Sequence, residues 1–387
     1  MTTVMTILGT RPELIRLSRV IARLDATPGV RHLLVHTGQN YDYELNGIFF
    51  DDLGIRAPDH YLGVDTSTLG HVLGGTLIKT EALLWAERPD AVLILGDTNS
   101  AIAALMAKRM RIPVYHMEAG NRCFDENVPE ETNRRIVDHV ADYNLVYTEH
   151  ARRNLLAEGL HPRRILLTGS PMREVLDHQR QRIAASTVLA DLSLEPGRFM
   201  LVSAHREENV DAPERLSALL DCLERVHAEF GLPLLVSTHP RTRKRLEQLV
   251  GDTGRTVTDG VVFHAPLGFS DYVRLQREAR ATLSDSGTIS EESAILGFPA
   301  VTLRDSIERP EALDTGAMVM TGLDPGNVVE ALHAVLADHD GGVPADPQGL
   351  PSRLCPPEYE VTTCSQRVVR FILSTHRRHA QWSGLRS

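Results

Sequence analysis

Short apolar runs alternate with longer amphipathic stretches along almost the whole chain. In the first half the apolar runs include Val4–Leu8, Ala91–Leu95 and Val114–Met117, and the second half opens another at Phe199–Ser203. Between the runs, apolar residues recur at the three- and four-residue spacing of a helix, as in the stretch that begins at Leu14. Buried parallel strands have continuous apolar sequences and are usually followed by a helix. We therefore predict an α/β protein.

The chain is longer than one hydrophobic core usually supports. It has 387 residues and a mass of 42.9 kDa, whereas single cores stop growing at about 250–300 residues. Residues 181–198 lack a strong apolar period and contain Pro196-Gly197, so we predict that they link two domains. We expect a first domain over 1–180, a second over 181–362, and a C-terminal helix over 363–387 that packs back on the first.

Acidic side chains follow two of the predicted strands in the first domain. Asp97 ends the run that starts at Ala91, and Glu118 ends the run that starts at Val114. Pro129 suits the first turn of a helix and places Glu130 at the same rim of the sheet. We predict that the three carboxylates converge there. Two alternatives remain open: Glu130 and Arg134 form an exposed helix pair, or Asp97 caps the next helix.

Polar loops at strand-to-helix junctions are candidates for holding an anion. Gly9-Thr-Arg-Pro-Glu13 opens the first helix, whose N–H groups and positive dipole end attract anions, and Arg11 adds a charged fork. The segment is not a GxGxxG motif, which disfavours NAD. Alternatively, Gly9 merely closes a tight turn.

Two further segments of the second half carry candidate chemistry. His205 follows the strand at Phe199–Ser203 and has a cation, Arg206, beside it. Ser286, Gly287 and Thr288 offer N–H groups and hydroxyls to a phosphate at a helix start, while Glu292 could accept hydrogen bonds from a ribose diol. The alternative is a Ser N-cap with a Glu capping box.

Composition narrows the possible partners and compartment. The net charge of −10 argues against nucleic-acid binding, which draws on an excess of Lys and Arg. No apolar run approaches the roughly 20 residues that span a bilayer, and no secretory signal is evident, so we expect a cytoplasmic protein without a membrane partner. The four cysteines show no CxxC spacing, so we predict free thiols and no metal site.

A series of motifs resembles that of the bacterial non-hydrolysing UDP-N-acetylglucosamine 2-epimerases. The motifs follow the family's order over nearly the whole chain. They are Gly9-Thr-Arg-Pro-Glu13, Gly96-Asp-Thr98, Glu118-Ala-Gly120, Pro129-Glu-Glu-Thr-Asn-Arg134, His205-Arg-Glu207, Asp285-Ser-Gly287 with Glu291-Glu292, and Glu308-Arg-Pro-Glu311.

The resemblance implies two Rossmann-like domains facing a cleft, the glycosyltransferase-B type of fold. It further implies elimination of UDP to a 2-acetamidoglycal and re-addition with C2 inverted, without a cofactor. The implied catalytic residues are Asp97, Glu118, Glu130 and His205. The candidate ligands of the UDP-sugar are Arg11, Arg16, Arg134, Arg206, His239, Tyr272, Ser286, Gly287, Thr288 and Glu292, with Tyr272 near uracil. A homodimer is the family expectation.

Some features depart from the family's pattern. Arg16 stands where many members carry Lys, and only Gln39 of Gln39-Asn-Tyr-Asp42 matches a segment that binds an activating second substrate molecule. Glu118-Ala-Gly-Asn-Arg-Cys-Phe124 resembles the subgroup that acts on modified sugars such as diacetamido-uronic acids or 6-deoxy N-acetyl sugars. A glycosyltransferase of the same build, a hydrolysing epimerase and a non-catalytic sensor of nucleotide sugars are the rival hypotheses.

Overall fold

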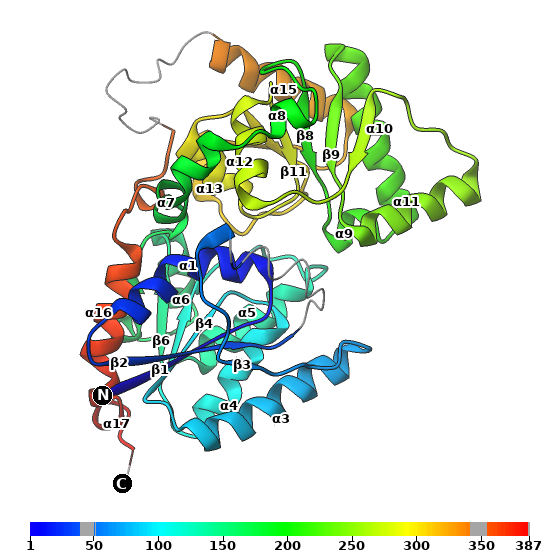
Figure 1. The fold of residues 1–387 in the computed structure, drawn as a ribbon. Coiled ribbons are helices and arrows are strands. Elements are labelled where there is room, and N and C mark those ends of the chain that lie inside the picture. Colours follow the sequence, from blue (N-terminus) through cyan, green and yellow to red (C-terminus); the bar gives the residue numbers. More distant parts are fainter. Residues whose placement is uncertain (39–49, 51, 341–353, 386–387) are drawn as a thin grey trace. The chain divides into compact units, whose positions relative to one another are not determined.

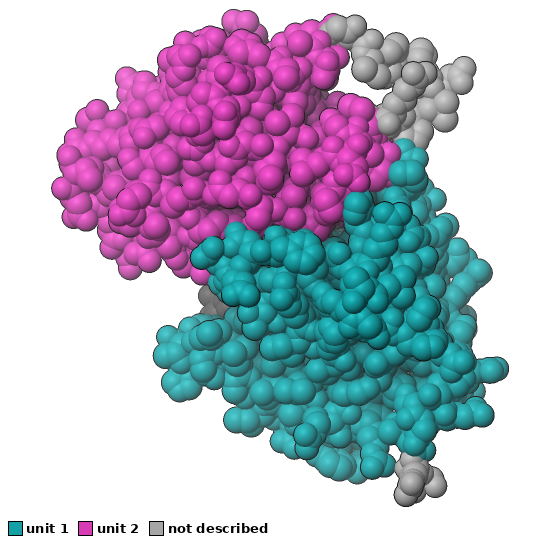
Figure 2. Space-filling view, turned by 180° about the vertical axis from the view of Figure 1, so that it is seen from behind, with its two compact units in different colours: residues 1–178, 357–387 teal, residues 179–356 magenta. Residues whose placement is uncertain are grey.

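The chain forms two compact units. The computed structural model describes residues 1–38, 50, 52–340 and 354–385, so the Gln39-Asn-Tyr-Asp42 segment lies outside the described residues. Unit 1 comprises Met1–His178 with Pro357–Ser387, and unit 2 comprises Gln179–Pro356 (Figure 2). In the described part of the chain, no helix is long and apolar enough to cross a membrane.

Unit 1 is built on a seven-stranded parallel sheet in the order β3-β2-β1-β4-β5-β6-β7 (Figure 1). The strands are β1 Thr2–Leu8, β2 Val30–His36, β3 His60–Tyr61, β4 Ala91–Leu95, β5 Val114–Met117, β6 Tyr143–Val146 and β7 Ile165–Leu167. Every residue of the central strands β4 and β5 is buried, which explains their continuous apolar sequences. The prediction of an α/β fold with parallel sheets is confirmed.

The helices of unit 1 begin where proline and polar residues allow. Pro12 stands in the first turn of α1, and Pro129 is the first residue of α5, where a missing N–H leaves no hydrogen bond unmade. The helices are α1 Arg11–Ala26, α3 Leu69–Glu87, η1 Asn99–Ile102, α4 Ala103–Arg109, α5 Pro129–Val140, α6 Glu149–Ala157, η2 Pro162–Arg164, α7 Met172–Ala185, η3 Pro357–Tyr359, α16 Cys364–Thr375, η4 His376–Arg378 and α17 His379–Trp382.

The C-terminal segment belongs to unit 1, where α16 lies beside α1 (Figure 1). Phe371 of α16 meets the rings of Tyr115 and Tyr143 edge-on, at centroid distances of 6.1 and 5.4 Å. The hydroxyl of Tyr115 lies 2.7 Å from that of Thr375. Aromatic and polar contacts thus attach α16 to the strands β5 and β6.

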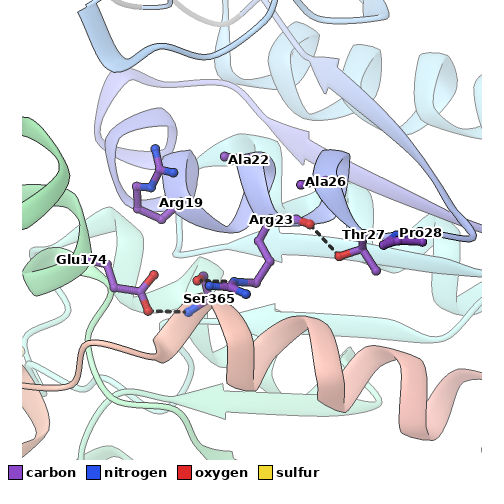
Figure 3. A pocket seen from close by; sticks show the side chains of 8 residues that line it. All are labelled: Arg19, Ala22, Arg23, Ala26, Thr27, Pro28, Glu174 and Ser365. Carbon is purple, nitrogen blue, oxygen red and sulfur yellow. Dashed lines mark hydrogen bonds between the residues drawn. The ribbon is translucent and has the colours of Figure 1, made fainter.

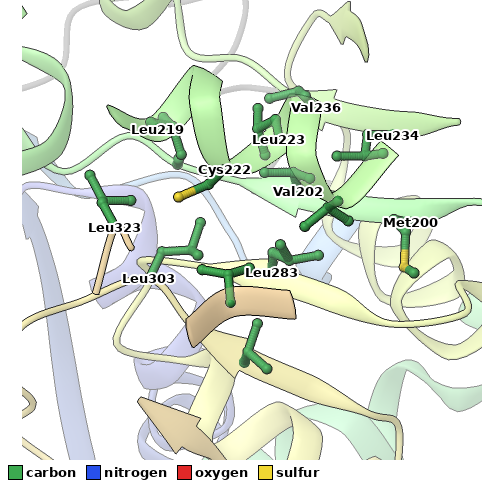
Figure 4. Close-up of a cluster of buried hydrophobic side chains, with 14 of the residues drawn as sticks. Met200, Val202, Leu219, Cys222, Leu223, Leu234, Val236, Leu283, Leu303 and Leu323 are labelled. Atoms are coloured by element: carbon green, nitrogen blue, oxygen red, sulfur yellow. The ribbon is translucent and has the colours of Figure 1, made fainter. Parts of the chain in front are cut away.

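Unit 2 repeats the plan with a six-stranded parallel sheet in the order β10-β9-β8-β11-β12-β13. Apolar side chains of the strands and of α10 form its core, among them Val202, Leu223, Val236 and Leu283 (Figure 4). The strands are β8 Met200–Ser203, β9 Leu234–Ser237, β10 Val261–His264, β11 Thr282–Ser284, β12 Ala300–Thr302 and β13 Val319–Met320. The helices are α8 Val188–Asp191, α9 Glu207–Val210, α10 Pro213–Phe230, α11 Pro240–Thr253, α12 Phe269–Glu278, α13 Ile289–Leu296, α14 Glu311–Asp314 and α15 Pro325–Asp340.

The prediction of a linker over 181–198 is wrong. Helix α7 runs to Ala185, through the boundary between the units, and α8 follows at Val188. Val175, Leu176, Gln179 and Ile183 are all buried, and they share one face at helical spacing. The polar Gln179 interrupts the apolar stripe in the sequence and hides the helical period.

Both sheets reverse their strand order next to their first strand. In unit 1 the reversal lies between β1 and β4, and in unit 2 it lies between β8 and β11. Such a reversal is called a topological switch point. The connections on its two sides run in opposite directions, and the strand ends there form the usual ligand-binding crevice of open α/β sheets. Arg11 begins the helix after β1, and the loops after β4, β8 and β11 carry Asp97, His205 and Ser286, which puts candidate residues at each switch point.

Burial of His36 at the end of β2 predicts a pH-dependent stability. Desolvation lowers the pKa of His36 to about 4, and its Nδ1 accepts the Gly38 N–H at 3.0 Å. The neutral ring is favoured in the folded state, so stability is present above the unfolded pKa of about 6.5 and falls as the pH drops towards 4. We expect a loss of about 2 kcal/mol between pH 7 and pH 5, measured by urea unfolding.

His36→Asn serves as the comparison, since its side-chain oxygen still accepts from Gly38 but does not titrate. The difference in unfolding free energy between the two pH values should be about 2 kcal/mol smaller in this variant. An equal pH dependence in both proteins would contradict the prediction.

Candidate active site

Asp97 is held at the end of β4 by a buried arginine. Arg134 donates to Asp97 Oδ2 through Nε at 2.9 Å and Nη2 at 2.5 Å, and Asn133 donates to the Asp97 carbonyl oxygen at 2.9 Å. The capping alternative is wrong, because the N-cap of η1 is Thr98 and Asp97 bonds to Arg134 instead. The fork of Arg134 therefore orients this carboxylate at the strand end.

Glu118 follows β5 in a left-handed backbone conformation, with φ of 64°. Such a conformation costs about 1–3 kcal/mol in a residue with a side chain, and it persists where surrounding contacts enforce it. The carboxylate of Glu118 forms an ion pair with Arg16, whose side chain is only 5% exposed. Two residues on, Gly120 has φ of 81°, and a Cβ there would lie 2.4 Å from the Ala151 carbonyl oxygen. The backbone of this turn thus fixes the position of Glu118 at the end of β5.

Arg134 also contacts Glu131, a buried acid that the sequence analysis did not single out. Arg134 Nη1 donates to Glu131 Oε2 at 2.9 Å, and the Cys123 N–H donates to the same oxygen at 3.2 Å. Burial raises the pKa of Glu131, but Cys123 and Arg134 outweigh it and hold that pKa below its ordinary value. The alternative of an exposed helix pair is wrong, since Arg134 is 3% exposed; Glu130 lies half-buried in the first turn of α5. The i,i+3 spacing of Glu131 and Arg134 in the sequence would have indicated that the two side chains pair on one face of the helix.

The loop after β1 is organised by Glu13. This buried carboxylate accepts from the Gly9 N–H at 2.9 Å, the Thr10 hydroxyl at 2.8 Å and the Ser100 hydroxyl at 2.6 Å. Burial raises the pKa of Glu13 above its ordinary value, although all three donors oppose that shift. Glu13 therefore joins the loop after β1 to the loop after β4, and Arg11 lies half-buried at the start of α1.

In unit 2, Asp285 shapes the loop that carries His205 and Arg206. The fully buried carboxylate accepts from the His205 N–H at 3.0 Å and the Arg206 N–H at 3.0 Å. The His205 ring is 47% exposed, with Nδ1 3.6 Å from Asp285 Oδ1. Asp285 belongs to one of the sequence motifs, and in the structure its carboxylate positions the His205 loop.

Ser286, Gly287 and Thr288 form a turn before α13. The Ser286 hydroxyl accepts from the Thr288 N–H at 3.3 Å, and Arg309 donates to the Gly287 carbonyl oxygen at 2.5 Å. A Cβ on Gly287 would lie 2.7 Å from Arg309 Nη1, so a larger residue there requires the guanidinium to move. The alternative of a Ser N-cap is wrong, because Thr288 is the N-cap and its side chain makes no capping bond.

The remaining predicted ligands occupy different environments. Glu292 is buried on α13 and accepts from Gln276 of α12 at 2.6 Å, while Tyr272 is half-buried one turn earlier on α12. His239 is exposed, and it caps α11 by accepting the Arg241 N–H at 3.3 Å. Gln276 was missed, because nothing in the helical segment around it, Arg274-Leu-Gln-Arg-Glu278, distinguishes it from an exposed polar residue.

A cavity of about 460 Å³ lies apart from these groups, between α1 and the start of α16 (Figure 3). Arg19, Arg23, Glu174 and Ser365 line it together with small side chains of α1. None of the predicted site residues contributes to it.

Comparisons with known proteins agree on one family. The family model described as UDP-N-acetylglucosamine 2-epimerase matches residues 22–372. A Methanocaldococcus jannaschii protein named UDP-N-acetylglucosamine 2-epimerase is 35% identical over 340 residues, covering 85% of this chain and 91% of the relative.

Solved structures give the same result. A UDP-N-acetylglucosamine 2-epimerase from Rickettsia bellii superposes with a TM-score of 0.89 at 44% identity, covering 98% of each chain. The Methanocaldococcus jannaschii enzyme in complex with UDP-GlcNAc and UDP gives a TM-score of 0.87 at 32% identity, covering 96% of this chain and all of that one. The glycosyltransferase-B type of fold is thereby confirmed.

Proposed function

Because the chain belongs to the UDP-N-acetylglucosamine 2-epimerase family, we propose that it interconverts UDP-N-acetylglucosamine and UDP-N-acetylmannosamine. The observation that carries the proposal is the pair of carboxylates, Asp97 and Glu118, each oriented by a buried arginine at the carboxyl ends of the neighbouring strands β4 and β5. The relative and the two structures described above are all named UDP-N-acetylglucosamine 2-epimerases, so a modified UDP-sugar is not favoured as the substrate.

The chemistry consists of an elimination and its reversal on the other face of the sugar. A carboxylate takes the C2 proton, the bond from C1 to the UDP oxygen breaks, and its electron pair leaves with UDP to give a 2-acetamidoglycal. UDP then adds back at C1 while an acid delivers a proton to the opposite face of C2. We propose that Asp97, Glu118 and Glu130 supply these proton transfers, which need acids within hydrogen-bond reach of C2.

Unit 2 is the proposed holder of UDP. Ser286, Gly287 and Thr288 precede the N-terminus of α13, where N–H groups and the helix dipole favour a diphosphate. Arg206 and His205 lie on the loop that Asp285 holds, and Arg11 is a further proposed ligand of the diphosphate. Preorganised cations stabilise the charge that develops on departing UDP. We propose that Glu292 binds the ribose diol and that Tyr272 lies near uracil. The remaining proposed ligands contact the sugar or the diphosphate, and they are Arg16, Arg134 and His239.

Proton NMR of the purified protein with UDP-N-acetylglucosamine in D₂O tests this function. We expect the manno isomer to appear with deuterium at C2, because C2–H cleavage exchanges the proton with solvent. Accumulation of free N-acetylmannosamine and UDP would indicate a hydrolysing epimerase instead. UDP protection against thermal unfolding without any C2 exchange would overturn the proposed reaction and favour a transferase or a sensor.

We also propose a homodimer in the cytoplasm. Helix α3 exposes the large apolar side chains of Ile78, at 69%, and Trp85, at 57%, and their seven-residue spacing places both on one face. A groove of about 400 Å³ between α3 and α4 continues this face past Trp85 and Leu105. Apolar faces of this kind mark association surfaces, and a second copy is the partner that we propose. The four buried, unbridged cysteines fit a reducing compartment.

Ile78→Glu is expected to shift the protein from dimer to monomer in sedimentation at micromolar concentration, because it places a charge in the apolar interface. Lys79→Glu, which changes a side chain held by the carbonyl oxygens of Leu62 and Gly63, is the matched charge control and should leave the dimer intact. An Ile78→Glu protein that remains dimeric would show that this face of α3 is not the interface.

A further inference from the structure

A network with a fully buried centre lies beneath the carboxylates of unit 1. Its centre is His116 on β5 and Asp138 on α5, whose side chains are both 0% exposed. His116 Nδ1 lies 2.9 Å from Asp138 Oδ1, and His116 Nε2 lies 2.7 Å from the Gly96 carbonyl oxygen. Arg122, also 0% exposed at its side chain, donates to Asp138 at 2.7 Å and pairs with Glu158 through its other nitrogens at 2.7 Å.

The network contacts the backbone on both sides of the candidate acids. Gly96, whose carbonyl oxygen receives the His116 hydrogen bond, directly precedes Asp97. Asp138 accepts the Gly120 N–H at 3.2 and 3.1 Å, and Gly120 closes the left-handed turn that begins at Glu118. One buried histidine and one buried carboxylate therefore link the loops after β4 and β5.

We propose that His116 and Asp138 are positioning residues, which hold the backbone of Asp97 and Glu118 in the geometry of proton transfer. The inference rests on the proposed epimerase function. The two residues touch the loops and not the reacting atoms, so they act through Asp97 and Glu118. A displacement of about 1 Å in a reacting group lowers a rate about 100-fold, so a hydrogen bond to the residue before Asp97 has a large effect.

Two substitutions of His116 separate its two hydrogen bonds. His116→Asn keeps a polar amide near the Nδ1 position, facing Asp138, and loses the donor to Gly96. His116→Gln reaches the Nε2 position and keeps the donor to Gly96. We expect kcat to fall about 100-fold in His116→Asn and less than about 10-fold in His116→Gln, with KM within about threefold of wild type in both.

His32 provides the matched control on the same sheet. This buried histidine lies 2.9 Å from the Thr6 hydroxyl and 2.7 Å from Asp25, and it contacts neither loop of the site. His32→Asn should lower the unfolding midpoint while leaving kcat within about twofold of wild type.

Hydrogen exchange by mass spectrometry gives a readout that does not depend on the substrate. We expect the amides of residues 96–98 to exchange faster in His116→Asn than in His116→Gln or wild type. Equal losses of kcat and equal exchange in the two His116 variants would overturn the positioning role. If the wild-type protein does not convert UDP-N-acetylglucosamine, the proposed function fails, and the exchange comparison alone then decides this inference.

Discussion

Asp97→Asn and Glu118→Gln are each expected to lower the rate of C2 exchange by about 1,000-fold or more, the range that a positioned general acid or base contributes. An amide of the same shape cannot take or give the proton at C2. The fold should survive, because the arginine partners retain other contacts: Arg134 still pairs with Glu131 after the change at Asp97. UDP affinity should stay within a few fold, since the proposed UDP ligands lie mainly on unit 2.

Deuterium incorporation at C2, followed by proton NMR, measures the rate, and isothermal titration with UDP measures affinity. Glu126→Gln is the control, because Glu126 is an exposed acid of the loop between Glu118 and Glu130. It should retain the wild-type rate. Near-normal exchange in Asp97→Asn or Glu118→Gln would remove that residue from the proposed catalytic set.

Arg134→Met is expected to have the largest effect on stability, together with a loss of activity. Arg134 is 3% exposed and serves two carboxylates, Asp97 and Glu131, so its removal takes the fork from Asp97 and leaves the buried Glu131 with the exposed Arg135 as its cation. Breaking a buried ion pair in this way costs about 3–5 kcal/mol. The rate of C2 exchange should also fall at least about 100-fold, since Asp97 loses the fork that orients it.

The neighbouring Arg135→Met offers a matched comparison. Arg135 donates to the other oxygen of Glu131 from an exposed position, with its side chain 46% exposed. Exposed pairs of this kind contribute about 0.2–1 kcal/mol, so the urea midpoint and the rate should change little. Equal urea unfolding midpoints for Arg134→Met and Arg135→Met would contradict the prediction that the buried ion pairs of Arg134 stabilise the fold.

The apolar pattern of the strands and the parallel topology of the sheet explain which acidic residues of the site could be predicted from the sequence. Parallel strands place their carboxyl ends at one edge, so an acid after β4 and another after β5 must lie at neighbouring positions of that edge. Asp97 and Glu118 could therefore be found from the sequence. Glu13, Glu131 and Asp285 could not, because a buried carboxylate that organises a loop has the same local signature as an acid in the first turn of a helix or at a strand end.

The sequence by itself determined the strand–loop–helix order, the strand ends that carry the acids, and the family, since these depend on residue type, short-range periodicity and motif order. Only the tertiary structure decided the partners of each charge. Arg134 reaches Asp97, Arg16 reaches Glu118, and His116 reaches Gly96 across distances of 20 to 102 positions in the chain. The continuous helix α7 is a second case, because burial of Gln179 depends on neighbours that the local pattern does not contain. Such contacts arise from packing between elements, and residue spacing alone does not specify them.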